Sequence, residues 1–245
     1  RTHLKIKKEN LGLQAKIVLP SLALGCSTFV MQASESVISV CFNSSLLQYG
    51  GDIAVGAMTI LTSVMQFAML PLQGLGQGAQ PIISYNYGAG NVERVKAAFK
   101  LLLKASLCYS ILLWLFVMFF PQAFAAMFTS DASLMEYTKT ALRIYMACLL
   151  LFGIQMACQM TFTSLGKAKA SILVAVMRKF ILLIPLIYIM PTLFTSNQTM
   201  AVYMAEPVAD FLAVSFTAIL FTFQFKKVIA QMTTSSSSKK EHVTI

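Results

Sequence analysis

Six long apolar stretches run through this chain of 245 residues, and each is long enough to cross a lipid bilayer as a helix. A spanning helix needs about 20 mostly apolar residues. In lipid the backbone must satisfy its own hydrogen bonds, which favours helices. We place the stretches at Ile17–Leu47, Ile53–Ile83, Ala97–Phe120, Ala141–Leu165, Ala170–Phe194 and Thr199–Phe225. The pattern predicts an all-α membrane protein, a bundle of six transmembrane helices.

Composition supports a membrane protein and argues against a soluble domain. The chain is 57% hydrophobic and 11% charged, whereas about 25% of residues are charged in ordinary soluble domains. Its net charge of +10 is divided among clusters beside the spans, which predicts contact with anionic membrane lipid and no nucleic-acid binding. The five cysteines lie in or at the ends of apolar stretches without a CxxC pair, so we expect buried thiols and no metal site.

The positions of the basic residues predict the topology. All but two of the 19 Lys and Arg residues lie in alternate gaps between the stretches or near the stretch ends beside those gaps. These are Arg1, Lys5, Lys7, Lys8, Lys16, Arg94, Lys96, Lys100, Lys104, Lys167, Lys169, Arg178, Lys179, Lys226, Lys227, Lys239 and Lys240. The other gaps and the stretch ends beside them hold only Lys139 and Arg143. Because basic residues near span ends stay on the cytoplasmic side, we expect a multi-pass protein of the inner (plasma) membrane with both termini cytoplasmic.

The same pattern divides the chain into three parts. We expect a basic cytoplasmic linker with the start of the first helix at 1–16, a transmembrane lobe at 17–225 and a polar cytoplasmic tail at 226–245. Within the tail, the run Ser235–Ser238 and the Lys-Lys-Glu that follows it are expected to be disordered. Short turns are expected at Tyr49–Asp52 and Gly166–Lys169, and a longer outer loop at Pro121–Glu136. Because the chain starts with Arg and shows no signal-peptide pattern, we expect it to be part of a longer protein.

Polar residues recur at helical spacing inside four of the stretches, which predicts a shared polar interior. The candidates for lining this cavity are Gln32, Ser39, Asn43, Gln73, Gln77, Gln155, Gln159 and Tyr203. An alternative is that these side chains only join helices through hydrogen bonds. Three carboxylates, Glu35, Glu206 and Asp210, are the candidates for ion coupling, since a charge at mid-membrane costs several kcal/mol. The alternative for them is a position near an interface, or hydrogen bonding at a helix break beside Pro207.

Glycines and prolines are concentrated in the second stretch. Gly74 and Gly78 form a small-xxx-small pair that permits close helix approach. Prolines make a helix easy to bend. The segment is therefore a candidate gate or hinge, built from Pro71, Gly74, Gly76, Gly78 and Pro81.

Three segments carry a resemblance to a known family. The longest reads Gln73-Gly-Leu-Gly-Gln-Gly-Ala-Gln-Pro-Ile-Ile-Ser-Tyr-Asn-Tyr-Gly-Ala-Gly-Asn91, followed by Val-Glu-Arg-Val-Lys96. The others are Ser164-Leu-Gly-Lys-Ala-Lys169 and Glu206-Pro-Val-Ala-Asp210. Together they resemble the multidrug and toxic compound extrusion (MATE) family. The resemblance covers roughly residues 1–225 and looks like the second six-helix lobe of a twelve-helix, two-lobe transporter.

The resemblance implies export of small organic, often cationic, compounds by exchange with protons or sodium ions. It implies an N-terminal lobe of the same transporter as partner and no cofactor besides the coupling ion, H⁺ or Na⁺. Glu35 matches the acidic position on the family's seventh helix. The sodium-coupled branch has a second acidic residue on the tenth helix, but the corresponding span, Ala141–Leu165, contains no Asp or Glu. This departure favours protons and leaves sodium open.

Other functions fit the pattern less well. A flippase of lipid-linked precursors would be favoured by many basic residues inside the spans, and a membrane scaffold gives no reason for a mid-span Glu35. An enzyme is not expected, because both histidines, His3 and His242, lie at the termini and no metal or nucleophile constellation appears.

Overall fold

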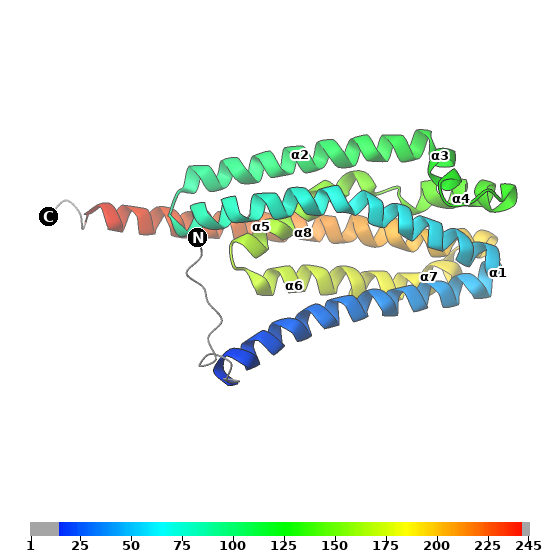
Figure 1. Ribbon diagram of the computed structural model, residues 1–245, viewed down its shortest axis with the longest axis horizontal. Helices are drawn as coiled ribbons and strands as arrows, with labels where there is room; N and C mark the ends of the chain where they lie inside the picture. Colours follow the sequence, from blue (N-terminus) through cyan, green and yellow to red (C-terminus); the bar gives the residue numbers. More distant parts are fainter. Residues whose placement is uncertain (1–14, 242–245) are drawn as a thin grey trace, which may run out of the picture. The chain divides into compact units, whose positions relative to one another are not determined.

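The computed structural model describes residues 15–241, which contain helices and no strand. The chain divides into two compact units, residues 1–40 and 41–245. In chain order the elements are α1 (Ala15–Gly88), α2 (Val92–Phe119), α3 (Pro121–Ala126), α4 (Ala132–Tyr145), η2 (Leu149–Leu151), α5 (Phe152–Ser164), α6 (Ala168–Val176), η3 (Met177–Leu183), α7 (Ile184–Leu193), η4 (Thr195–Asn197) and α8 (Gln198–Glu241) (Figure 1).

Helix α1 consists of two arms that meet at Gly51. This glycine has φ 65° and ψ −162°, a conformation that is open essentially to glycine alone, and the chain reverses direction there (Figure 1). The turn expected at Tyr49–Asp52 is thereby confirmed. Thr199 donates its hydroxyl to the backbone carbonyl of Tyr49 at 2.7 Å, which satisfies an acceptor next to the break. From Asp52 to Gly88 the helix is continuous, through both Pro71 and Pro81.

Among the described residues, four helices are long and apolar enough to cross a membrane: Ala33–Gly88, Val92–Phe119, Lys169–Leu193 and Thr195–Thr234. A fifth span results if α4 and the segment Leu149–Ser164, which are bent by 43° at a short break, count as one. The predicted all-α membrane class agrees with these helices. The predicted number of six stays a prediction.

The structure differs from expectation at the outer loop and at the tail. The segment Pro121–Glu136 was expected to be a loop, but it contains α3 and the start of α4. Asp131 begins α4 because its carboxylate accepts hydrogen bonds from the backbone N–H groups of Ser133 at 2.8 Å and Leu134 at 3.2 Å. A hydrogen bond from the Ser133 hydroxyl, together with these two backbone bonds, holds the pKa of Asp131 below its usual value. Helix α8 runs to Glu241, so residues 235–241, which were expected to be disordered, are helical.

Helices α2 and α5 approach each other closely at Gly153. A Cβ atom added to this buried residue would lie 2.6 Å from the backbone carbonyl atoms of Ser106 and 2.5 Å from Oγ of Ser110. By contrast, nothing among the described residues lies within 4 Å of a Cβ added to Gly74 or Gly78. Within this segment the close contact is made instead by Gly76, which packs on Met160.

Because the backbone of α2 cannot move out of the way cheaply, Gly153→Ala is expected to lower the free energy of unfolding by about 1–3 kcal/mol. Gly78→Ala is the matched control, and it is expected to be neutral or to stabilise by up to about 1 kcal/mol through helix propensity. Thermal unfolding of the purified variants measures both changes. Equal midpoints for the two variants would contradict the tight α2–α5 contact.

Candidate functional site

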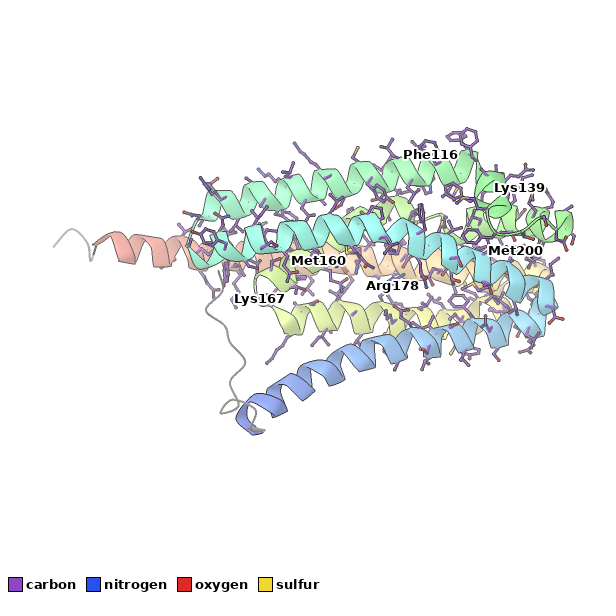
Figure 2. The ribbon with its side chains drawn as sticks, in the orientation of Figure 1. Phe116, Lys139, Met160, Lys167, Arg178 and Met200 are labelled. Atoms are coloured by element: carbon purple, nitrogen blue, oxygen red, sulfur yellow. The ribbon has the colours of Figure 1, made fainter. Side chains whose placement is uncertain are left out.

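Arg178 lies well inside a membrane span. It belongs to the π-helical segment η3, within the candidate span Lys169–Leu193 of 25 residues. Figure 2 shows it between Lys167, toward one end of the bundle, and Lys139, toward the other. The expectation that Arg178 and Lys179 lie near a span end is wrong. The helix starts at Ala168 and continues to Leu193, which carries both residues into its interior.

The Arg178 guanidinium forms ion pairs with two carboxylates of α8. Its Nε donates to Oδ1 of Asp210 at 2.6 Å, and its Nη2 donates to Oε1 of Glu206 at 2.8 Å. The side chains of Arg178, Glu206 and Asp210 are 18%, 7% and 3% exposed. The two carboxylates are four residues apart on one helix, so they stand one turn apart on the same face. The planar guanidinium donates through several N–H groups at once, which makes it suited to bridging them.

An aromatic ring and two titratable side chains of the bent span complete the surroundings of this cluster. The guanidinium carbon of Arg178 lies 5.1 Å from the centre of the Phe152 ring, a cation–π distance. Phe152 is the first residue of α5, directly after the break that follows α4. At this break Tyr145 ends α4 and Cys148 precedes η2, which brings two more titratable side chains near Arg178 and Asp210. Three consecutive spans therefore contribute to one buried group.

Each of these three spans departs from regular α-helix at the cluster. The span that carries Arg178 is π-helical there, and the span before it is broken after Tyr145. In α8, Pro207 lies between the two carboxylates and has no N–H to donate to the Tyr203 carbonyl. Irregular helices are frequent at functional sites, and transporters place interrupted helices around their binding sites. Trp114 donates its indole N–H to the Ala147 carbonyl at 2.9 Å, which satisfies one acceptor of the break.

Tyr203 takes a position that its predicted cavity-lining role did not anticipate. The side chain is fully buried, and its hydroxyl donates to the Ala54 carbonyl at 2.7 Å. Its ring lies edge-on to Tyr137 at 6.4 Å between centroids. These contacts hold α8 against the second arm of α1 and α4.

The remaining predicted residues are spread over the described structure. Gln155, one turn after Phe152, is buried, and its Oε1 has no hydrogen-bond partner among the described residues. Gln159 is half-buried, while Asn43, Gln73 and Gln77 are exposed. Only Glu206 and Asp210 of the predicted set meet in the Arg178 cluster; the gate or hinge role of the proline and glycine residues stays a prediction.

The third carboxylate candidate, Glu35, is exposed and belongs to the first unit, together with Ser39. The side chain of Gln32 lies outside the described part of the structure. The cavity that these residues were expected to share with the second unit stays a prediction.

Arg178 was missed as a functional residue, although two signals pointed to it. It lies within the stretch expected to span the membrane, Ala170–Phe194, and a cation there needs a buried counter-charge. The next stretch supplies two, at Glu206 and Asp210.

Comparisons with known proteins agree on one kind of protein. The sequence profile of the MatE family matches residues 27–189. The multidrug export protein MepA of Staphylococcus aureus (strain N315) is 26% identical over 192 residues, 78% of this chain and 41% of that protein. MepA of Staphylococcus haemolyticus (strain JCSC1435) is 24% identical over 215 residues, 84% of this chain and 47% of that protein. The chain thus spans less than half the length of these relatives.

Solved structures of transporters share the fold. An outward-facing multidrug resistance MATE family transporter of the MOP superfamily matches with a TM-score of 0.79 and 20% identity, over 93% of this chain and 51% of that one. An inward-facing structure of such a transporter matches with a TM-score of 0.79 and 19% identity, over 96% and 53%. In each case this chain has the fold of about half of the solved chain.

Proposed function

Because this chain belongs to the MatE family of membrane transporters, we propose that it forms the C-terminal lobe of a secondary transporter that exports small organic, often cationic, compounds in exchange for protons or sodium ions. The partial coverage of the relatives supports a partner lobe N-terminal to this one. Counting the two arms of α1 as separate spans, because the chain reverses at Gly51, supports a lobe of six helices. The name of the MepA relatives supports drugs as the exported compounds.

The observation that carries the proposal is the ionisable cluster of Arg178, Glu206 and Asp210 inside the candidate spans. Ionisable groups at such depth are costly in lipid and mark ion or substrate pathways. A lipid-linked precursor flippase is less well supported. Among the described residues, Arg178 lies deep in a span and is bonded to two carboxylates, which compensates its positive charge and makes it less available to an anionic headgroup.

The proposed exchange is tested with the complete transporter that contains this chain, reconstituted in lipid vesicles with the fluorescent cation ethidium as probe. We expect ethidium transport to require an inward gradient of protons or of sodium ions, imposed separately. Asp52→Asn, which removes an exposed carboxylate at the Gly51 turn, is expected to behave as wild type. Ethidium movement that is independent of both gradients, or absent under both, would overturn the proposal.

The proposed topology is tested by cysteine labelling. Asn91 lies between α1 and α2, and Ser130 lies between α3 and α4; Figure 1 shows these two connections at opposite ends of α2. In a variant without native cysteines, cysteines introduced at Ser130 and Ser196 are expected to react with a membrane-impermeant maleimide added to intact cells. Those at Asn91 and Ser236 are expected to react only after the cells are opened. The reverse pattern would refute cytoplasmic termini.

A further inference from the structure

We infer that Arg178 is a positioning residue, an internal counter-ion that gives the buried Glu206–Asp210 pair a single net negative charge, so that the cluster binds and releases one proton. The inference rests on the proposed function only for its part in transport, since proton binding by the cluster is measurable without transport. On this inference, the coupling ion that binds at the cluster is a proton.

The formal charges of the three side chains limit how many protons the cluster can bind. One guanidinium and two ionised carboxylates carry a formal net charge of −1, and protonation of one carboxyl brings the cluster to zero. Protonation of the second carboxyl would leave the always-charged Arg178 without a counter-ion in a buried place, which is strongly unfavourable. The cluster is therefore restricted to two charge states, −1 and 0, which differ by one proton.

A proton fits this cluster better than a metal cation. The guanidinium already bonds one oxygen of each carboxylate, at 2.6 Å for Asp210 and 2.8 Å for Glu206. A proton needs a single carboxylate lone pair, whereas a metal cation needs several oxygen ligands.

Among the described residues, three titratable groups near the cluster do not change this count. At the break after α4, Tyr145 lies near Arg178 and Cys148 near Asp210, and both are neutral in their ordinary forms. On α8, Tyr203 lies one turn before the carboxylates and donates its hydroxyl to Ala54. The other basic residue of the π-helical segment, Lys179, is half-buried, and it provides a control of the same charge at the next position.

Substitutions that change the charge of the cluster in steps test the inference. Asp210→Asn leaves a neutral Arg178–Glu206 pair, which cannot accept a proton without exposing a buried positive charge. Arg178→Gln leaves two buried carboxylates that repel each other, so at least one is expected to stay protonated. The double variant Arg178→Gln/Asp210→Asn has one carboxyl and again alternates between −1 and 0.

The first measurement is the infrared absorption of protonated carboxylic acids in the purified complete transporter, followed as a function of pH. We expect Asp210→Asn to lose the acid signal of the cluster, and the double variant to regain one signal through Glu206. In Arg178→Gln the acid signal is expected to persist at pH values at which wild type has lost it. Lys179→Gln is expected to leave the signal of wild type unchanged.

The second measurement is proton-driven ethidium transport by the same variants, normalised to folded protein. In Asp210→Asn the rate of proton-driven ethidium transport is expected to fall by at least about fivefold, which corresponds to the lower end of usual coupling free energies. The double variant is expected to recover a large part of that rate. A merely structural ion pair predicts the opposite, because a double variant would then be no better than Asp210→Asn.

The outcomes separate this inference from the proposed function. If the acid signals and ethidium transport of Asp210→Asn equal those of wild type, the inference fails and the proposed export stands. If the acid signals follow the charge of the cluster while wild type moves no ethidium under any gradient, proton binding stands and the proposed export fails. A double variant that regains neither signal nor transport overturns the role of Arg178 as internal counter-ion.

Discussion

An Arg178→Met variant is expected to lose about 3–5 kcal/mol of its free energy of unfolding, the usual cost of removing one partner of a buried ion pair. The variant keeps a side chain of similar length but leaves Glu206 and Asp210, 7% and 3% exposed, without their cation. It also loses the stacking on Phe152. Unfolding midpoints in detergent, followed by circular dichroism, measure the difference from wild type.

Two control variants show whether the loss comes from uncompensated charge. The triple variant Arg178→Met/Glu206→Gln/Asp210→Asn contains no charge in the cluster, and it is expected to regain most of the lost stability, because neutral replacements of whole buried ion pairs are often tolerated. Lys179→Met removes the neighbouring positive charge and is expected to have a small effect. If Arg178→Met unfolds at the midpoint of wild type, the ion pairs contribute little to this fold.

The second large effect is expected from Glu35→Gln, which is proposed to abolish coupling of export to the ion gradient. Glutamine keeps the shape and hydrogen-bonding capacity of the side chain but removes the titratable charge. In reconstituted vesicles we expect gradient-driven ethidium transport to fall by at least about fivefold, with membrane insertion preserved. Asp52→Asn, an exposed carboxylate later in the same helix α1, is the matched control.

Comparison with Asp210→Asn at equal expression separates the two carboxylate sites. If Glu35→Gln and Asp210→Asn both lose gradient-driven transport, coupling requires a carboxylate from each unit of the chain. If Glu35→Gln fails to fold or insert, Glu35 has a structural role. Unchanged coupled transport in Glu35→Gln rules out its proposed role and leaves the Arg178 cluster as the candidate coupling group.

Much of the fold was predictable because it follows from local chemistry. Apolar stretches of spanning length have few stable forms in lipid, which makes the all-α class a strong prediction. A glycine between two such stretches marks a reversal, and Gly51 provides it with a conformation that other residues rarely adopt. The break after α4 had no such signal, because the residues Met146–Leu151 are as apolar as the helices beside them.

The candidate site was predictable only in part. Helical spacing showed that Glu206 and Asp210 share one face of their own helix. The high cost of a charge in lipid marked both carboxylates as functional candidates. The spacing did not show which residues of other helices contact that face. The glycines illustrate the same limit: the Gly74 and Gly78 pair carries the recognisable spacing, whereas the tight packing occurs at the isolated Gly153, because the position of the neighbouring helix decides where space is missing.

The sequence by itself determined that this chain is a helical membrane protein with acidic residues in its spans, because hydropathy and helical periodicity are properties of each segment alone. Only the tertiary structure decided that Arg178 bonds Glu206 and Asp210, residues 28 and 32 positions away along the chain. That pairing depends on the depth and rotation of one helix against the next, to which the π-helical turn at Met177–Leu183 contributes an offset. Side-chain contacts between helices depend on this relative position, which cannot be read from the sequence of either helix alone.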